Sequence, residues 1–223
     1  KLLQGHMPFG LHKILSQDAK YVTFLRNPMN RVISLYNYIC RTPRHYLYKT
    51  LVRGKMSFDD FIKNRVTTET NNGQSRLLLG VDNTLPYGDF NGRHFDQVLE
   101  NLEEHFIFVG ISEKFDDSLI VLSQSLNWGS VPYYFRHNVT KKKNNHFKIS
   151  DFTASKIEKD NFYDIKLYKT IEERFQSAIK INERIHFDKL KKYRYFNNIY
   201  QKAVWPYWFS RSIFREVRSF LIG

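Results

Sequence analysis

The chain has 223 residues, 42% of them hydrophobic and 16% aromatic, so it can form a folded core and does not belong to the class of disordered proteins. Its 35 Lys and Arg residues against 22 Asp and Glu give a net charge of +13, which attracts nucleic acid, acidic glycans and anionic membranes alike. The single cysteine, Cys40, excludes a disulfide within this sequence, and no run of about 18 apolar residues predicts a transmembrane helix.

The stretch from Tyr21 to Tyr38 predicts a buried strand, a tight turn and a helix. An apolar and aromatic run ends at Leu25, and apolar residues at helical spacing follow Arg26-Asn27-Pro28. Asn27 suits the N-cap of a helix, and Pro28 suits its first position, where a missing N–H costs nothing. Arg26 is therefore expected at the carboxyl end of the strand, where open α/β sheets bind ligands.

Two side chains of the following helix extend this prediction to a phosphate site. Arg31 and Ser34 are three residues apart, so they share a face of the helix. The guanidinium of Arg26, a second one on the first helical turn and a hydroxyl one turn later could converge on a phosphate, which suits the planar fork of arginine. Arg31 has an alternative role, an ion pair with a carboxylate.

The remaining elements are predicted in chain order from periodicity and turn residues. They are a basic linker over 41–55, a short helix capped by Ser57, loops over 71–73 and 80–92, an amphipathic helix over 95–104, a buried strand over 106–109, a helix over about 115–126, a basic loop over 141–145 and helices from about 154 onward. Two strand-to-helix units separated by helices predict the α/β class, a parallel sheet flanked by helices with a helix-rich C-terminal part. A single domain over 1–223 is expected.

The stretch over 186–223 is basic and aromatic, and we expect it to form a helical extension of the domain. Within it, the large apolar residues of 205–221 recur at spacings of three and four, while the arginines fall largely on another side. This pattern is typical of an interfacial membrane helix and also of an amphipathic helix that packs on protein. Packing on protein is the preferred interpretation, and peripheral membrane contact is the alternative.

The segment Arg26-x-Pro28-x-x-Arg31-x-x-Ser34-x-Tyr36 resembles the 3′-phosphate-binding segment of sulfotransferases that use 3′-phosphoadenosine 5′-phosphosulfate (PAPS). Further stretches resemble, in the same order, the branch containing heparan sulfate 2-O-sulfotransferase and its bacterial relatives. These are Gly5-His6 and the stretches over 72–80, 108–119, 138–140 and 161–168. Together they cover roughly residues 5 to 180.

The resemblance implies a P-loop-like fold and transfer of a sulfuryl group from PAPS to a carbohydrate hydroxyl, with no metal. His6 matches the position of the catalytic histidine of that branch, and a histidine has the pKa that a general base needs near neutral pH. Arg26, Ser34 and Arg31 match the residues that bind the 3′-phosphate. The motif from Gly110 to Ser118 is expected to be architectural, a strand, a turn and a helix, with Glu113 and Asp116 near the helix start.

Four residues are expected to contact the acceptor. Gln74 and Arg76 are assigned to the acceptor cleft from the motif alone. Tyr134 and Arg136 combine a stacking face with a charge and could contact a sugar ring, although core packing explains these two equally well.

The same family opens with a strand and a loop containing Lys and Thr that grips the 5′-phosphosulfate, as a P-loop grips a phosphate. No such stretch occurs in this sequence. We therefore expect a chain that lacks its first strand and this loop, either as a fragment or, alternatively, as a divergent protein that never had them. Such a chain would not complete the donor site and could be inactive alone.

Other functions stay open at this point. A non-catalytic module for polyanions would use the +13 charge and the basic, aromatic stretch over 189–195. Nucleic acid is not an expected partner, because no recognised nucleic-acid motif occurs in the sequence. A P-loop kinase relative would share the architecture, but no Walker loop is present. No C-x-x-C or H-E-x-x-H pattern predicts a metal site. The compartment is expected to be cytoplasmic or membrane-associated in a bacterium and the Golgi lumen in a eukaryote.

Overall fold

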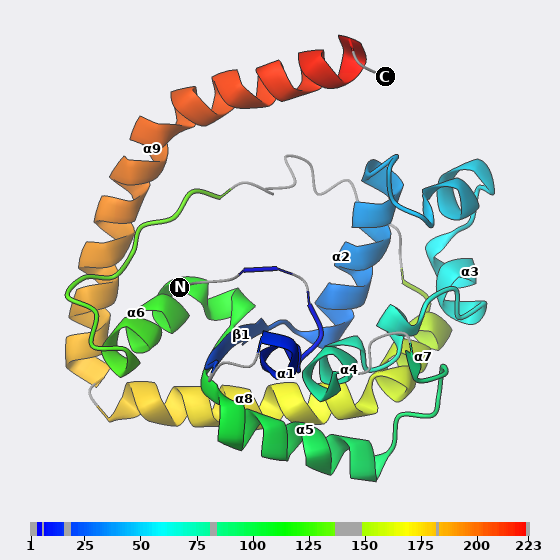
Figure 1. Cartoon of the computed structure of the whole chain (residues 1–223), viewed down its shortest axis with the longest axis horizontal. Coiled ribbons are helices and arrows are strands. Elements are labelled where there is room, and N and C mark those ends of the chain that lie inside the picture. The colour runs from blue at the N-terminus through cyan, green and yellow to red at the C-terminus, as the bar shows by residue number, and fades with distance from the viewer. Residues whose placement is uncertain are drawn as a thin grey trace. The chain divides into compact units, whose positions relative to one another are not determined.

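The computed structural model describes residues 4–5, 7–15, 19–80, 84–136, 149–181 and 183–221, with side chains up to Tyr207 in the last stretch (Figure 1). The chain divides into two compact units. The first consists of Lys1–Glu113 and Phe147–Gln176, and the second of Lys114–His146 and Ser177–Gly223. The single domain and the extension from residue 186 stay predictions.

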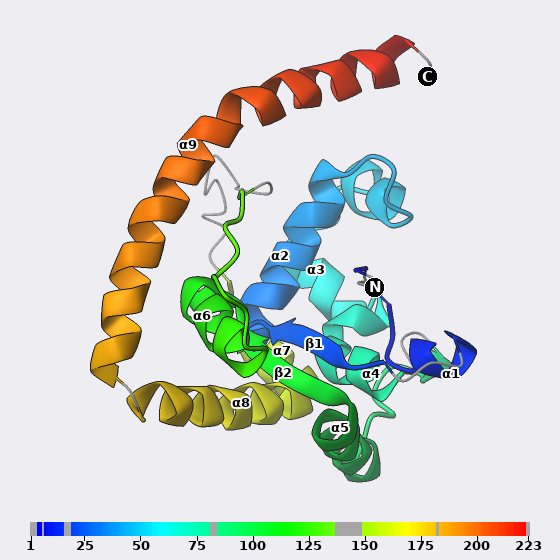
Figure 2. The same ribbon diagram turned by 60° about the vertical axis from the view of Figure 1, so that its left-hand side comes forward.

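The first unit contains a two-stranded parallel sheet, formed by β1 (Tyr21–Leu25) and β2 (Phe106–Ile111). Figure 2 shows the two strands side by side. Their register pairs Leu25 with Ile111 at the carboxyl ends. Helices flank this sheet, so the predicted α/β class is confirmed. The second strand extends two residues past the predicted 106–109 because Gly110 and Ile111 are buried and paired with β1.

The turn after β1 begins α2 (Pro28–Arg41) as the sequence predicted. The Asn27 side chain accepts a hydrogen bond from the N–H of Asn30 at 3.2 Å, and Pro28 occupies the first helical position. The backbone N–H of Asn27 donates to the Glu113 carboxylate at 2.9 Å. Glu113 lies in the 3-10 turn η4 (Ser112–Lys114) that follows β2, so one side chain ties the carboxyl end of the second strand to the turn that ends the first.

The other helices of this unit are short, apart from α5 and α8. They are α1 (Leu11–Leu15), the π-helical turn η1 (Lys49–Arg53), α3 (Phe58–Lys63), the 3-10 turn η2 (Thr68–Thr70), α4 (Gly73–Leu79), α5 (Gly92–His105), α7 (Asp151–Asp160) and α8 (Phe162–Lys180), which passes into the second unit after Gln176. The predicted Ser57 cap is confirmed, since its hydroxyl accepts from the N–H of Asp60 at 3.1 Å. The expected linker over 41–55 contains η1 because Leu51 is buried in the core.

The main apolar core of the first unit joins α2, α3, η1 and α7. Its buried members are Val32, Ile39, Leu47, Leu51, Phe58, Phe61, Ile62 and Ile157. The apolar face of α2 therefore anchors the helix along its length. The start of α2, beside β1, is held at the same time by the polar contacts of Asn27.

Two helices far apart in the sequence cap each other. The Asp164 carboxylate, 1% exposed, accepts from the N–H of Gln74 at 3.0 Å and from the N–H and hydroxyl of Ser75 at 2.7 and 2.6 Å, all at the start of α4. In return, the Asn72 side chain accepts from the N–H groups of Tyr163 and Asp164 at 2.9 and 3.1 Å, at the start of α8. Each helix thus receives its N-cap from the other.

The described part of the second unit contains the helices α6 (Phe115–Ser125) and α9 (Glu183–Leu221) and the non-helical stretch over 126–136. Leu190 and Tyr193 of α9 are buried, and this helix packs against α6. The predicted helix-rich C-terminal part is confirmed. Among the described residues, no helix is both long and apolar enough to cross a membrane.

Replacement of Asp164 by Asn tests the exchanged caps. The amide would turn an NH2 group toward backbone donors in a buried site, so we expect the free energy of unfolding of the first unit to fall by about 3 kcal/mol. The measurement is urea denaturation followed by circular dichroism. Tryptophan fluorescence would not serve, because Trp128, Trp205 and Trp208 all belong to the second unit.

Asp96→Asn is the matched control, because Asp96 lies exposed on α5. Its change should stay within about 0.5 kcal/mol. Equal denaturation midpoints for the two variants would show that the exchanged caps do not stabilise the first unit.

Candidate functional site

Arg26 lies exposed at the carboxyl end of β1, and the side chain of Gln74 fixes its backbone. The N–H of Arg26 donates to the Gln74 amide oxygen at 2.8 Å, and the Gln74 amide nitrogen donates to the carbonyl of Arg26 at 2.9 Å. Among the described residues, no hydrogen bond or ion pair engages the Arg26 guanidinium. The backbone of Arg26 is therefore held in place, while its guanidinium remains available to bind a ligand.

Ser34 lies half-buried on α2, two turns after the Asn27 cap. Its hydroxyl likewise has no hydrogen-bond partner among the described residues. Arg26 and Ser34 are therefore alike in one respect. Among the described residues, neither the guanidinium nor the hydroxyl has a hydrogen-bond partner.

Arg31 makes a different set of contacts. Its Nη1 donates to the carbonyl of Glu69 at 2.7 Å, and its Nη2 lies 3.7 Å from the Glu69 carboxylate. The guanidinium lies over Gly73, where a Cβ would be 2.5 Å from Nη1. The ion pair that the sequence analysis left open as an alternative is therefore present, and Gly73 is the residue that makes room for it.

Arg76 is buried, with 1% of its surface exposed, and contacts backbone on both sides. Its Nε donates to the carbonyl of Asn71 at 2.7 Å, and its Nη2 donates to the Asn71 side chain at 2.8 Å and to the carbonyl of Pro86 at 2.7 Å. Its Nη1 donates to the carbonyl of Leu85. These contacts hold the loop after residue 83 against α4.

Gln74 and Arg76 therefore act on the protein's own backbone in this structure. Gln74 is 7% exposed and contacts Arg26, and Arg76 contacts the loop beyond α4. Their assignment to the acceptor cleft, which rests on the motif, stays a prediction. Both residues position the elements around the strand end.

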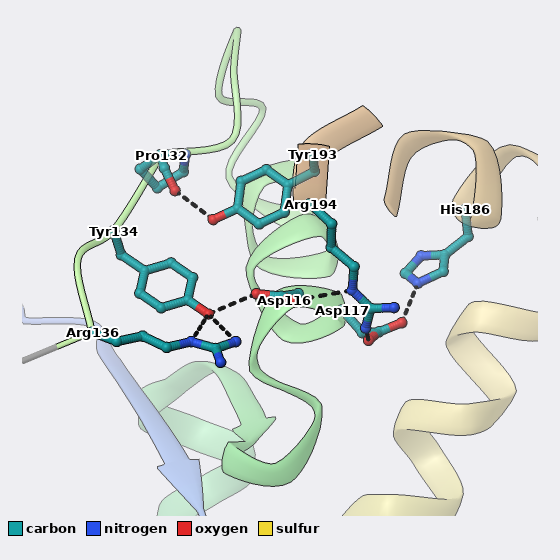
Figure 3. Close-up of polar contacts among 8 residues, drawn as sticks. All are labelled: Asp116, Asp117, Pro132, Tyr134, Arg136, His186, Tyr193 and Arg194. Carbon is teal, nitrogen blue, oxygen red and sulfur yellow. Dashed lines mark hydrogen bonds and ion pairs between the residues drawn. The ribbon is translucent and has the colours of Figure 1, made fainter. Parts of the chain in front are cut away.

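Tyr134 and Arg136 belong to the second unit, where Figure 3 shows them in a network of polar contacts. The Tyr134 hydroxyl donates to Asp116 at 2.8 Å and accepts from Nε and Nη2 of Arg136 at 3.2 and 3.1 Å. Burial raises the pKa of the Tyr134 phenol, with Arg136 opposing the shift and Asp116 adding to it. Core packing alone does not explain these two side chains, because Arg136 is exposed and Tyr134 is only half-buried.

The same network continues to residues that the sequence analysis did not select. Arg194 donates to Asp116 at 3.1 Å and to Asp117 at 3.3 Å, and Nε2 of the buried His186 lies 2.9 Å from Asp117. Asp116 and Asp117 lie in the first turn of α6. This confirms the prediction that Asp116 lies near a helix start. Nothing in the sequence indicated that His186 and Arg194 of α9 are the partners of these carboxylates. Their contacts depend on packing between segments that are far apart in the chain.

Glu113 and Tyr168 form a second contact that the sequence did not reveal. The Tyr168 hydroxyl donates to Glu113 at 3.4 Å. Burial raises the pKa of Tyr168 to about 12, and the nearby carboxylates of Glu113 and Glu172 add to the shift. In the part that follows β2, the motif over 110–118 thus contacts other parts of the protein, as its expected architectural role requires.

His6, the predicted general base, lies outside the described residues, so its role stays a prediction. The stretch over 138–140 also lies outside them. Among the residues that are described, no group of three His, Cys, Asp or Glu side chains is arranged as a metal site.

Comparison with known proteins identifies a family. Residues 1–194 match the sequence profile of a family described as galactose-3-O-sulfotransferase. No curated protein matches the chain significantly. The predicted class, a carbohydrate sulfotransferase, is confirmed by this match. The heparan sulfate 2-O-sulfotransferase branch named from the motifs stays a prediction.

Gln74→Ala tests whether this side chain fixes the strand end. Without the amide oxygen, the N–H of Arg26 loses its acceptor, so its hydrogen exchange should become roughly five- to tenfold faster. The measurement is amide exchange by NMR, with Gln97→Ala on the exposed side of α5 as the control. An unchanged Arg26 amide in Gln74→Ala would remove the positioning role.

Proposed function

The chain belongs to the galactose-3-O-sulfotransferase family, and we propose that it transfers a sulfuryl group from PAPS to a hydroxyl of a carbohydrate. The observation that supports this proposal is Arg26, exposed at the carboxyl end of β1 on a backbone that Gln74 holds from both sides. Parallel α/β sheets bind their ligands at this end of the strands. The family's description makes a galactose-bearing glycan the first acceptor to test.

The residues at the strand end fit the 3′-phosphate of PAPS. Arg26 offers a guanidinium with no internal partner among the described residues, and Ser34 offers a hydroxyl on the helix that follows. A guanidinium binds phosphate oxygens in a fork geometry, and the N-terminal turn of α2 adds a favourable dipole for an anion. Arg31 is already paired with Glu69, so we assign it to the support of this site, with Arg26 and Ser34 as the direct ligands.

PAPS supplies an activated SO3 group on a phosphate leaving group, and the protein must then hold the donor and deprotonate the acceptor hydroxyl. Positioning contributes much of the rate in such group transfers. Gln74 and Asp164 contribute to it indirectly, since they fix the backbone of Arg26 and the start of α4. We assign the deprotonation to His6, on the family match of its position.

Arg26→Ala tests the donor site. A charge-assisted fork to the 3′-phosphate contributes about 1.5–3 kcal/mol. Loss of this interaction should lower the affinity for 3′,5′-ADP roughly 10- to 100-fold, to the level of 5′-ADP. Calorimetry of both nucleotides at moderate salt measures the preference directly.

Arg93→Ala removes an exposed arginine from α5 and is the matched control for charge. It should leave the preference for 3′,5′-ADP unchanged. If Arg26→Ala kept that preference, the assignment of the 3′-phosphate to Arg26 would be wrong. Equal, weak binding of both nucleotides by the unmodified chain, lost on addition of salt, would indicate the polyanion module instead.

His6→Ala tests the general base. We expect sulfuryl transfer at saturating donor to slow by roughly 10²–10⁴-fold, with the affinity for 3′,5′-ADP unchanged. The assay follows transfer from PAPS to a galactoside, and His94→Ala on α5 is the control. A His6 variant with the full rate would assign the proton transfer to another group.

A further inference from the structure

The second unit contains an open pocket of about 770 Å³, and none of its lining residues is assigned to the donor. It is bounded by the C-terminal half of α6, the loop over 127–133 and one side of α9. Side chains that matter for its chemistry are Gln124, Trp128, Tyr133, Lys189, Lys192 and Phe196. The volume lies within the range of small-molecule and cofactor sites.

The loop that forms one wall is fixed where it leaves α6. Asn127 has a left-handed backbone with φ of 49°, and its N–H donates to the carbonyl of Gln124 at 3.1 Å. The N–H of Trp128 donates to the carbonyl of Ser123 at 2.8 Å. These two bonds are those of a Schellman C-cap, so the direction in which the chain enters the pocket wall is determined by the end of the helix.

The same loop is fixed again where it meets α9. The Tyr133 ring is stacked on Tyr193 at 5.8 Å between centroids, with 16° between the planes. The Tyr193 hydroxyl donates to the carbonyl of Pro132 at 3.0 Å, which Figure 3 shows, and Asn197 accepts from the N–H of Tyr134 at 2.9 Å. Because both ends are held, the pocket exists before any ligand binds.

Large aromatic surfaces in this pocket are open to solvent. Trp128 is 46% exposed, Tyr133 45% and Phe196 50%. Exposed aromatic side chains grouped around a hollow are typical of ligand-binding grooves. A pyranose ring suits them, because its C–H face is apolar and its edge carries hydroxyls that the amide of the exposed Gln124 can bind.

Positive charge lies on the α9 side of the pocket. Lys189 and Lys192 are three residues apart, so they share a face of the helix, and both are exposed. Within the described part of the chain, neither ammonium group has a hydrogen bond or an ion pair. Carboxylate or sulfate groups on the ligand would supply the missing partners.

We propose that this pocket binds an acidic carbohydrate, with sugar rings on Trp128 and Phe196 and an acidic substituent at Lys189 and Lys192. The choice of a carbohydrate over another polyanion rests on the proposed function of the chain. The pocket is also compact, whereas single-stranded nucleic acid is bound along extended basic grooves.

The test is calorimetry of the full chain with two hexasaccharides of equal length, one of alternating glucuronate and hexosamine and one of neutral glucose. We expect the acidic hexasaccharide to bind at least tenfold more tightly than the neutral one. Lys189→Gln with Lys192→Gln should weaken its binding at least tenfold, and so should Trp128→Ala. Trp128→Phe should retain most of the affinity because it keeps an aromatic face.

Lys191→Gln is the matched control, since Lys191 is exposed on the same helix and does not line the pocket. It should change the affinity less than twofold, and circular dichroism of each variant checks that α6 and α9 remain folded. Equal affinity for the two hexasaccharides, or an equal loss in Lys191→Gln, would overturn the proposal. It would also be overturned if an oligothymidine of the same charge bound as tightly and depended on the same lysines.

The result is independent of the donor assignment. Binding of the acidic hexasaccharide without any preference for 3′,5′-ADP would support the pocket and contradict the Arg26 site. Preference for 3′,5′-ADP without hexasaccharide binding would contradict the pocket alone.

Discussion

The exchange of N-caps between α4 and α8 is the constraint on which the candidate donor site depends. Asp164 is a buried carboxylate that receives two N–H groups and a hydroxyl from α4, and the positive end of that helix favours its charge. Asn72, in a left-handed conformation, serves α8 in the same way. Since a buried charge without such partners is costly, only one placement of the two helices satisfies both.

This placement determines the geometry at the end of β1. With α4 fixed, Gln74 reaches the backbone of Arg26 with both atoms of its amide, and Gly73 offers the surface on which the Arg31 guanidinium lies. Arg31 in turn engages Glu69, just before α4. The strand end is thus held by side chains from a segment almost fifty residues further along the chain, and not by the two-stranded sheet alone.

Local patterns in the sequence predicted the parts of the fold that local physics determines. Asn27 and Pro28 identify the start of α2 because capping depends on neighbours in the chain. The helix α4 was not predicted, since its caps come from Asp164, and a short segment with Gly73 in its first position has little intrinsic helix propensity. The motif assigned Gln74 to the acceptor cleft, which stays a prediction, and it gave no sign of the partner at Arg26, because that contact depends on tertiary structure.

Two arginines of the first unit, Arg76 and Arg26, differ in how far the protein itself satisfies their guanidinium groups. Arg76 is buried and contacts four carbonyl or amide oxygens of the protein, so its charge is already compensated. Arg26 has a fixed backbone and a side chain without an internal partner among the described residues. Sequence cannot distinguish the two, because the burial and the partners of each guanidinium depend on tertiary contacts. A ligand gains most from the group that the protein positions but does not satisfy.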